Sequence, residues 1–343
     1  GRVTQETRTV TGASSPYVTD WSYDSAGRVV STTYPDGEIV TTTYNPQGLP
    51  ETLAGEATYV TAAEYSALNQ IESMDLGAVQ RAYNYYGAEG NYRLQRIQLL
   101  GAGTTFDLSY TYDDAGNVAT ITDGGPGGQV QRIQYDHQDR LTAETNAYGA
   151  SYKNNEIGNL EVKTEGGTTY MMQYTDATHV HAPKVVNGET YEYDPNGNLL
   201  SGGGRTLAWD PENRLQQASY GGQTTTFTYD GDGMLVKREV DGETTIYIGP
   251  HYERDVTSGQ DTKYYYFGDE RVALQRIAVV SFIHTDHLGS TSIMSDQAGN
   301  AVGEAIRYFP YGTTRAGNPG TLPTDYLYTG QRRQEPLGGL YHM

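Results

Sequence analysis

Residues 191–200 read YEYDPNGNLL, and residues 209–215 soon afterwards read WDPENRL. Both stretches place an aromatic residue before an Asp, then a short polar turn and a Leu. In an extended strand Tyr191 and Tyr193 lie on the same face, and the segment 195–197 has the Pro, Asn and Gly of a tight turn. Each stretch therefore predicts a β-hairpin with a fixed turn, and the recurrence predicts a repeat.

The same unit recurs along nearly the whole chain. Further copies are YDSAGRV (23–29), YNPQGLP (44–50), YSALNQI (65–71), YDDAGNV (112–118), YDHQDRL (135–141), YKNNEIGNL (152–160) and YDGDGML (229–235). The spacing clusters near about 20 residues, which fits two strands and two turns and is too short for a helical repeat with its loop. One hairpin is marginal in water, so we expect the units to join edge to edge into one long antiparallel sheet that twists and coils.

Each position of the repeat has an expected structural role. In residues 224–242, Phe227 and Tyr229 face one side of a strand, and the Asp230 carboxylate accepts a backbone N–H of the turn. Gly231 or Gly233 takes the left-handed conformation. The residues predicted to build the repeat are Tyr23, Asp24, Gly27, Tyr112, Asp113, Gly116, Tyr135, Asp136, Tyr193, Asp194, Gly197, Trp209, Asp210, Tyr229 and Asp230.

The composition of the 343 residues supports a folded β protein. There are 31 Tyr and 42 Gly, and Thr is abundant. Tyr and Thr favour strands, Gly favours turns, and a disordered chain would be poor in aromatic residues. A segment at 62–75 could instead form one or two helical turns, although its position in the repeat favours a degenerate hairpin. Loops are expected at 124–128 and 175–190.

Charge and cysteine content exclude several classes of partner and site. The formal net charge is −19, which disfavours nucleic acid and anionic membranes as partners. The chain has no Cys, so disulfides, thiolate zinc sites and cysteine nucleophiles are absent. No apolar run approaches the roughly 20 residues of a membrane-spanning helix, so we expect no membrane insertion.

These repeats resemble the tyrosine-aspartate (YD) repeats of the Rhs family over roughly residues 15–275. That family includes bacterial polymorphic toxins, the C component of insecticidal toxin complexes and the extracellular region of teneurins. The resemblance implies an all-β fold in which YD-repeat hairpins form a spiralling antiparallel β-sheet, hollow like a barrel or shell. We expect residues 1–280 to form this shell.

A second resemblance covers residues 281–343. The segments FIHTDHLGSTSIMSDQAGNAV (282–302), YFPYG (308–312), YTGQ (328–331) and GLY (339–341) are similar to the Rhs-associated core. The implied core residues are His284, Asp286, His287, Leu288, Gly289, Ser290, Tyr308, Pro310, Tyr311, Gly312, Gly330 and Gln331. In bacterial members the core closes the C-terminal end of a shell around a variable toxin. The chain ends before the family's Arg-x-Tyr-Asp-Pro segment and catalytic aspartates, so we expect neither self-cleavage nor a toxin domain.

Two groups in the core segment invite a chemical interpretation. His284 and Asp286 have the spacing of metal ligands on one strand face. The favoured alternative is structural: Asp286 and Ser290 bond the backbone of the turn around Gly289, and His284 packs in the core. Ser290 lacks the strand–turn–helix context of a hydrolase nucleophile.

Candidate ion sites elsewhere have equally simple structural interpretations. His179 and His181 alternate on an expected strand, but a loop or surface pair is favoured over an ion site. The acidic turn that starts at Asp230 would need a Glu at position 12 of a calcium loop, where Asp241 stands. The Gly-rich stretches lack the Lys-Ser/Thr of a phosphate loop, and so are interpreted as turns.

The sequence therefore predicts a non-enzymatic structural shell with no cofactor and no metal. We expect it to be secreted or displayed on a cell surface, in a bacterium, and to enclose a C-terminal toxin or other protein cargo. The alternative is an adhesion or filament-forming module whose open edges pair with neighbouring copies. Carbohydrate stacking on the Tyr rows is a less favoured alternative, and an enzyme is the least favoured because no acid–base or nucleophile set is evident.

Overall fold

The computed structural model describes residues 1–13, 16–101, 103 and 105–342. Within them the chain has 36 β-strands and no α-helix, which confirms the all-β prediction. The remaining regular elements are four single-turn 3₁₀ segments, η1 (Ala88–Gly90), η2 (Pro319–Thr321), η3 (Tyr328–Gly330) and η4 (Glu335–Leu337).

The wall of the molecule begins with six strands that pair in chain order. They are β1 (Gln5–Arg8), β2 (Tyr17–Tyr23), β3 (Val29–Thr33), β4 (Ile39–Tyr44), β5 (Pro50–Ala54) and β6 (Thr58–Val60).

Thirteen strands follow in a second sheet, again paired in chain order. They are β7 (Ala63–Tyr65), β8 (Ile71–Leu76), β9 (Val79–Tyr85), β10 (Leu94–Gly101), β11 (Asp107–Tyr112), β12 (Val118–Asp123), β13 (Val130–Tyr135), β14 (Leu141–Glu144), β15 (Ala150–Asn154), β16 (Leu160–Glu165), β17 (Thr168–Gln173), β18 (Val185–Val186) and β19 (Glu189–Thr190).

A third sheet of thirteen strands completes the wall. They are β20 (Glu192–Tyr193), β21 (Leu199–Gly202), β22 (Arg205–Trp209), β23 (Leu215–Tyr220), β24 (Gln223–Tyr229), β25 (Leu235–Val240), β26 (Glu243–Ile248), β27 (Tyr252–Asp255), β28 (Gln260–Phe267), β29 (Glu270–Arg276), β30 (Val279–Thr285), β31 (Thr291–Ser295) and β32 (Ala301–Val302). Two short hairpins end the chain, β33 (Arg307–Tyr308) with β34 (Thr314–Ala316), and β35 (Arg332–Gln334) with β36 (Leu340–His342).

The three sheets are stretches of one continuous wall. Only two residues separate β6 from β7, and both bond to β8: the Thr61 N–H donates to the Asp75 carbonyl (3.0 Å), and the Asp75 N–H donates to the Ala62 carbonyl (2.9 Å). Between β19 and β20, the Tyr191 N–H donates to the Lys184 carbonyl (2.9 Å). Within each sheet, neighbouring strands in the chain therefore pair with each other, and these backbone bonds lie at the two junctions between the sheets.

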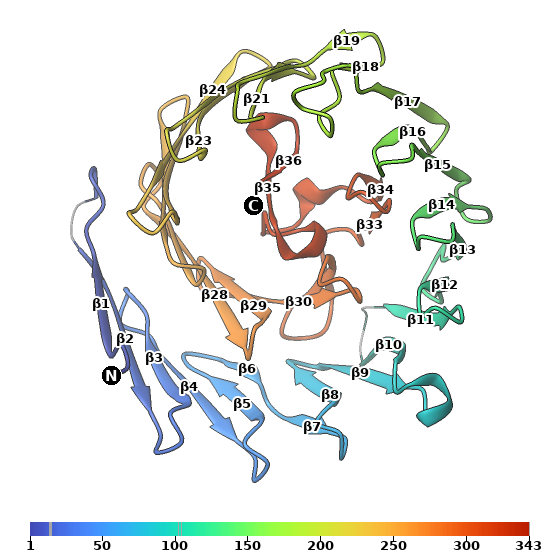
Figure 1. Ribbon diagram of the computed structural model, residues 1–343. Coiled ribbons are helices and arrows are strands. Elements are labelled where there is room, and N and C mark those ends of the chain that lie inside the picture. The colour runs from blue at the N-terminus through green and yellow to red at the C-terminus, as the bar shows by residue number, and fades with distance from the viewer. Residues whose placement is uncertain (14–15, 102, 104, 343) are drawn as a thin grey trace.

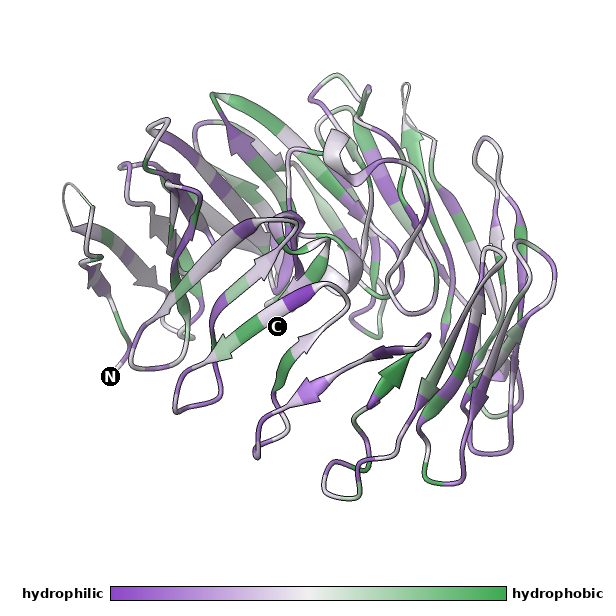
Figure 2. Ribbon diagram, turned by 90° about the horizontal axis from the view of Figure 1, so that it is seen from above, coloured by the Kyte–Doolittle hydropathy of each residue, from purple (hydrophilic) through white to green (hydrophobic). Residues whose placement is uncertain are grey.

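The wall winds round and overlaps itself (Figure 1). It starts at the N-terminal strands, passes β7–β17, returns past β20–β26, and brings β28–β30 to the inner side of the first strands. The two C-terminal hairpins, β33–β34 and β35–β36, lie inside the ring. Figure 2 shows hydrophobic and hydrophilic residues in short alternating bands along the strands, as a sheet with one packed face requires.

The alternation explains the abundance of Thr. Along β24, Thr225 and Phe227 are buried, whereas Thr228 on the other face is exposed. On exposed faces, cross-strand hydroxyls bond to each other, as in Thr43–Thr52 (2.7 Å), Thr111–Thr120 (2.6 Å) and Thr164–Thr169 (3.0 Å). Thr therefore suits the solvent face of this wall because it combines β propensity with a hydroxyl.

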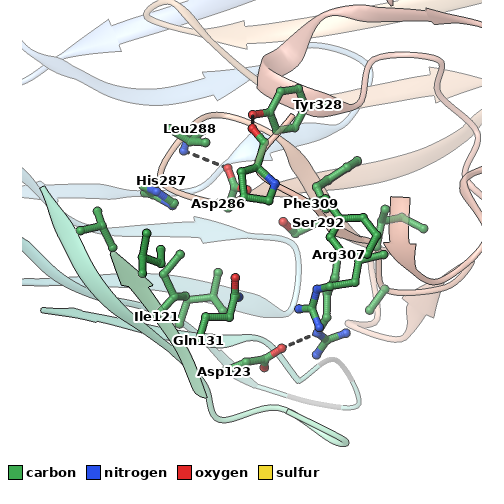
Figure 3. Close-up of a pocket in the computed structure, with 18 of the residues that line it drawn as sticks. Ile121, Asp123, Gln131, Asp286, His287, Leu288, Ser292, Arg307, Phe309 and Tyr328 are labelled. Atoms are coloured by element: carbon green, nitrogen blue, oxygen red, sulfur yellow. Dashed lines mark hydrogen bonds and ion pairs between the residues drawn. The ribbon is translucent and has the colours of Figure 1, made fainter. Parts of the chain in front are cut away.

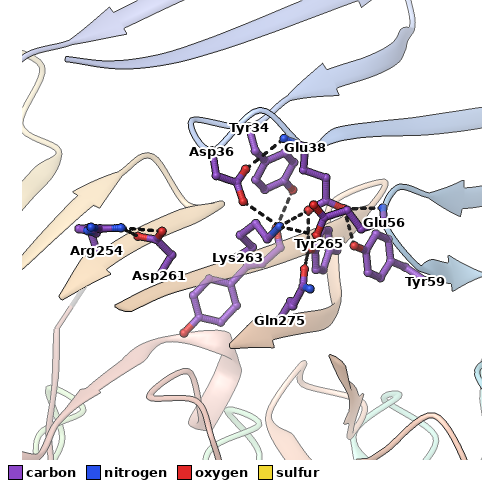
Figure 4. A network of polar contacts seen from close by, with 11 residues as sticks. Tyr34, Asp36, Glu38, Glu56, Tyr59, Arg254, Asp261, Lys263, Tyr265 and Gln275 are labelled. Carbon is purple, nitrogen blue, oxygen red and sulfur yellow. Dashed lines mark hydrogen bonds and ion pairs between the residues drawn. The ribbon is translucent and has the colours of Figure 1, made fainter. Parts of the chain in front are cut away.

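A buried polar network joins the two layers where the wall overlaps (Figure 4). Glu38, in the β3–β4 turn, has a fully buried side chain and accepts from Lys263 Nζ on β28 (2.5 Å). The Tyr59 and Tyr265 hydroxyls also donate to its carboxylate (2.5 and 2.8 Å), and the two tyrosine rings stack at 3.6 Å between centroids. The network therefore connects segments more than 200 residues apart.

A buried arginine makes a second link between the layers. Arg81, on β9, is 0% exposed, and its guanidinium bonds to Glu270 Oε1 (2.7 Å) and to the Ile283 carbonyl (3.4 Å). Apolar side chains from both layers, including Leu53, Ile246 and Phe282, fill the space between them.

Several expectations about local structure can now be assessed. The segment 62–75 forms β7 and β8, so the hairpin interpretation is confirmed over the helical one. Residues 124–128 connect β12 to β13 as a loop, but the predicted loop at 175–190 is partly wrong because β18 and β19 lie within it. The proposed boundary between residues 280 and 281 falls inside β30, and the division into shell and core stays a prediction.

Across the described ranges, no helix has the length and apolar character needed to span a bilayer.

Candidate functional site

The YD turns share one hydrogen-bond pattern. In the first, the Asp24 N–H donates to the Arg28 carbonyl (3.0 Å), and the Gly27 N–H donates to the Asp24 carbonyl (3.0 Å). The carboxylate of Asp24 accepts the Arg28 N–H (2.9 Å), four residues on. The same carboxylate contact, at 2.8–3.0 Å, is made by Asp113 with Asn117, Asp136 with Arg140, Asp194 with Asn198, Asp210 with Arg214 and Asp230 with Met234.

The fourth residue of each turn is left-handed. Gly27, Gly116 and Gly197 have φ of +83°, +100° and +87°. In the Asp230 turn it is Gly233 (φ +84°) rather than Gly231 that takes this conformation. Asp139 and Asn213 hold the position in two copies without Gly, with φ of +58° and +62°. These are among the non-Gly residues that tolerate it best.

The aromatic residue before each turn bonds the preceding repeat. The Tyr44 hydroxyl donates to the Val29 carbonyl (2.8 Å), and Trp209 does the same with its ring N–H to Leu199 (2.8 Å). Equivalent bonds of 2.7–3.0 Å run from Tyr23 to Val3, Tyr65 to Pro50, Tyr85 to Ile71, Tyr112 to Leu94, Tyr135 to Val118, Tyr174 to Leu160, Tyr193 to Pro183, Tyr229 to Leu215 and Tyr308 to Thr291. We call this series the tyrosine ladder.

Arginines at the end of a turn connect the ladder to the turn carboxylates. Arg28 pairs with Asp24 (2.6 Å) and lies over the Tyr44 ring, 4.3 Å from its centroid. Arg214 pairs with Asp210 (2.7 Å) and lies over Tyr229 in the next repeat. The turns and the ladder are therefore connected, because each of these arginines contacts a carboxylate in its own repeat and an aromatic ring in the next.

Sequence inspection misplaced one repeat and missed others. In YKNNEIGNL the turn is built on Asn154–Asn155, not on Tyr152: Asn155 accepts the Asn159 N–H (2.9 Å) as the Asp does elsewhere. Tyr152 instead donates to Glu165 (2.8 Å). Tyr85 and Tyr174 belong to the ladder although neither precedes an Asp. The wide gap between the copies at Tyr65 and Tyr112 was the signal that could have found Tyr85.

The core motif begins with another turn of the same kind. The Asp286 carboxylate accepts the N–H groups of Leu288 and Ser290 (both 2.9 Å), and Gly289 is left-handed (φ +78°). Thr285 stands where most of the other repeats have Tyr. The wall therefore continues into the predicted core without a change of local structure.

The other core segments assemble against this turn. The Ser290 hydroxyl accepts the Thr329 N–H (3.1 Å) beside Gly330, and the Thr291 N–H donates to the Leu327 carbonyl (3.1 Å). Gln331 bonds through its N–H to the Tyr328 carbonyl (3.1 Å).

The segment 308–312 is fixed by its own turn and by aromatic contacts. The Gly312 N–H donates to the Phe309 carbonyl (2.9 Å), and the Pro310 carbonyl accepts the Tyr328 hydroxyl. Gly312 has φ +86°, and a Cβ there would lie 2.6 Å from the Tyr328 ring, so no side chain fits. Tyr311 packs near Tyr152 on the wall, with ring centroids 5.4 Å apart.

An apolar cavity of about 350 Å³ lies between the wall and the core segment (Figure 3). On the wall side it is lined by Leu108, Val118 and Ile121 and their neighbours on β11–β14, and on the core side by residues 305–310. Asp123 and Arg307, which form an ion pair, also line it. A cavity of this size and character is typical of a small-molecule or side-chain site.

Asp286 and His287 border the same cavity. Burial raises the pKa of the Asp286 carboxyl and lowers the pKa of the His287 imidazole. The His287 ring packs 4.6 Å from the Tyr110 ring, centroid to centroid, and Leu288 beside it is 49% exposed. Both residues are half-buried, and the Asp286 carboxylate also contacts the Ser290 side chain, so the pair belongs to the turn around Gly289.

The other chemical candidates lie apart. His284 is fully buried and bonds Ser295 (2.8 Å), not Ser290, and burial holds its pKa well below the usual range. His179 contacts Asp176 (2.9 Å), whereas His181 contacts Asn159 (2.7 Å). Within the residues that the structure describes, no three His, Asp or Glu side chains are grouped to hold a metal ion.

Two family models match the sequence. The RHS Repeat model matches residues 1–39 and 23–61, and the Teneurin YD-shell model matches residues 132–327. The curated relatives include tRNA nuclease WapA of Bacillus subtilis strain 168, at 29% identity over 171 residues, and tRNA3(Ser)-specific nuclease WapA of Bacillus spizizenii, at 28%. The match covers 46% of this chain and 7% of each relative, so the chain spans a small part of their length.

Solved structures share the fold. The TcdB2-TccC3 crystal structure superposes with a TM-score of 0.79 and 19% identity, over 96% of this chain and 20% of that chain. The Photorhabdus luminescens Tc holotoxin pore gives 0.80 and 18%, over 96% and 19%. Because the shell model matches more than half of the 343 residues, this chain belongs to the teneurin YD-shell family of RHS/YD-repeat proteins.

Proposed function

We propose that this chain is a non-enzymatic section of a container wall, and that the container encloses a toxin or other polypeptide that follows the core segment. The observation that carries the proposal is the position of β36 inside the ring formed by the wall (Figure 1). Chain that continues from this strand starts on the inner side of the wall.

The relatives support a link to toxins. The matched structures bear the names of Tc toxin components, and the curated relatives are named as tRNA nucleases. We assign nuclease activity to parts of those relatives outside the matched segment, because the acidic charge of this chain repels RNA. All these relatives are bacterial, and we propose a bacterial protein that is secreted or displayed at the cell surface.

The cavities described in this chain bear on what it encloses by itself. Three cavities of about 310 to 440 Å³ are small-molecule sized. None of these three is large enough for an unfolded polypeptide. The chain spans about a fifth of the matched solved chains, so we assign the enclosed space to the wall of the whole protein.

Protection from protease tests the proposal. Full-length protein is treated with proteinase K, natively and after urea has opened the wall, and the segment after residue 343 is followed by mass spectrometry. We expect that segment to survive in the native protein and to be digested after opening, whereas the same segment expressed alone is digested at once. Equal digestion rates in all three samples would contradict enclosure.

The alternative of an adhesion or filament-forming module has one supporting observation. In the described chain β1 pairs only with β2, so its outer edge is open for another strand. Electron microscopy of the full-length protein distinguishes the two functions: filaments lost on Thr7→Pro substitution in β1 would favour assembly, and single closed particles would favour enclosure.

A further inference from the structure

One hairpin turn breaks the rule that the others follow. The β29–β30 turn consists of Ile277 and Ala278, with φ of +49° and +56°. Both central residues of such a turn must be left-handed, which favours Asn, Asp or Gly and disfavours β-branched residues. Among the residues that the structure describes, the five other two-residue turns with this backbone all have Gly in second place: Gly166–Gly167, Asn187–Gly188, Gly203–Gly204, Gly221–Gly222 and Asp241–Gly242.

The same turn is also strongly apolar and exposed. Ile277 is 71% exposed and the neighbouring Val279 is 59% exposed. A single exposed apolar residue is ordinary. Here an aliphatic side chain occupies a strained position and contributes nothing to a described core cluster, so folding gives no reason for its presence.

An acidic pocket adjoins the turn. A cavity of about 440 Å³ is lined by Ile277 and Ala278, by Asp36 and Glu56 from the first layer, and by residues 258–261 and 263. The Lys263 ammonium contacts three carboxylates, those of Asp36 (2.8 Å), Glu38 (2.5 Å) and Glu56 (3.3 Å). Negative charge therefore exceeds positive charge in this pocket, and the Glu56 side chain is 59% exposed.

We propose that the Ile277–Val279 turn and this pocket form a docking site for a basic, aliphatic segment of a partner protein. The turn would contact an aliphatic side chain of the segment, and Glu56 and Asp36 would pair with an adjacent Lys or Arg. A second copy of this chain does not fit, because each copy has a net charge of −19. The site lies outside the wall–core cavity, so the inference is independent of cargo enclosure.

The test uses labelled peptides and the fluorescence anisotropy of their complexes. The probe is fluorescein-GLKLRLG. The matched controls are fluorescein-GLELELG, which reverses the charge, and fluorescein-GSKSRSG, which keeps the charge and removes the aliphatic residues. We expect the probe to bind at least tenfold more tightly than either control, and to weaken when NaCl is raised from 0.05 to 0.5 M.

The decisive variant is Ile277→Asn with Ala278→Gly, which gives the turn the residues it has elsewhere. We expect probe binding to fall at least fivefold while the Tm rises by roughly 2 °C, because the left-handed positions are relieved. Glu56→Gln should weaken binding about threefold. Met171→Asn, which removes an apolar residue that is 60% exposed on β17, should leave binding unchanged.

Several outcomes would overturn the proposal. Unchanged binding to the double variant would place the probe elsewhere, and a lower Tm would mean that Ile277 serves the fold. Dimerisation lost in the double variant would identify a second copy as the occupant. Binding to phosphatidylserine vesicles in place of the probe would identify a lipid surface.

Discussion

The overlapped part of the wall and its single-layered part are built from the same repeat. The fraction of residues that are buried, however, differs greatly between the two. All five residues of β31 are buried, as are most of β28–β30. In β17 five of six residues are exposed. The strand pairing is equally regular in both, so burial comes from the second layer and from the core segment rather than from the repeat. Mutations in the two regions should therefore have unequal effects.

The largest expected difference concerns ion pairs. Lys263→Met leaves Glu38 without its ammonium partner inside the overlap, and we expect a loss of about 3 kcal/mol in the free energy of unfolding. Lys153→Met breaks the exposed Lys153–Glu161 pair (2.9 Å) of the single layer and should cost less than about 1 kcal/mol. Urea unfolding measures both variants, and similar losses would refute the comparison.

Truncation of a buried leucine and of an exposed leucine should also change the stability by unequal amounts. Leu274, on β29, is 0% exposed, whereas Leu100, on β10, is 46% exposed. We expect Leu274→Ala to cost about 3 kcal/mol through lost burial and the cavity left behind, and Leu100→Ala to cost less than about 1 kcal/mol. The midpoint shift in urea at constant m-value is the measurement. A cost at Leu100 that matched the cost at Leu274 would mean that the Leu100 side chain is also covered.

Protonation of the Glu38 carboxylate, which lies in the overlap, should lower the stability of the protein in acid. Burial by itself would raise the Glu38 pKa, but hydrogen bonds from Lys263, Tyr59, the Glu56 N–H and Tyr265 lower it overall. A lowered carboxyl pKa stabilises the fold above the unfolded pKa, and this stability is lost as pH falls through the folded value. We expect Tm to fall with pH below about 4.5, and to fall less in the Glu38→Gln variant.

The Lys263 pKa is shifted in the opposite direction, above its usual value. Burial would lower it, but the Asp36 and Glu38 carboxylates raise it overall. Its contribution is therefore complete below the unfolded pKa of about 10.4 and is lost at higher pH, as the pH rises through the folded value. An equal fall of Tm in acid in the original protein and in the Glu38→Gln variant would contradict the Glu38 prediction. That result would show that other carboxyl groups dominate the loss of stability.

The smallest effect is expected from one bond of the tyrosine ladder. Tyr112→Phe removes the hydroxyl that donates to the Leu94 carbonyl (2.7 Å) and should cost about 1 kcal/mol. Tyr135→Phe, in the next repeat, removes an equivalent bond (3.0 Å) and should cost about the same. The two losses measured together should add, because the bonds are separate. A much larger combined loss would indicate that repeats unfold as coupled units.

The sequence predicts the repeat well because its signal is local. A Tyr, an Asp four residues before a bonded N–H and a left-handed fourth residue all lie within one turn, so the hairpins could be placed at 23–29 or 229–235 from the letters alone. The shifted turn at Asn154–Asn155 shows the limit: Tyr152 alternates on the same strand, and only the strand register distinguishes the two positions.

The overlap could not be predicted, because its contacts have no local pattern. Glu38 sits in an ordinary turn sequence, PDGE, and nothing near it indicates a partner at Lys263. The same holds for Arg81 and Glu270, and for the cavity between Ile121 and the segment 305–310. Which strands overlap depends on the curvature accumulated over the whole wall, a property that no single repeat determines.

A zero-length crosslink tests most directly whether the wall winds back over itself. Carbodiimide joins an ammonium to a carboxylate only where they touch, and Lys263 Nζ lies 2.8 Å from Asp36 and 3.3 Å from Glu56. Tryptic mass spectrometry of the native protein should find residue 263 joined to residue 36 or 56, alongside the local link between Lys153 and Glu161. Finding the local link without the long-range one would contradict the winding wall.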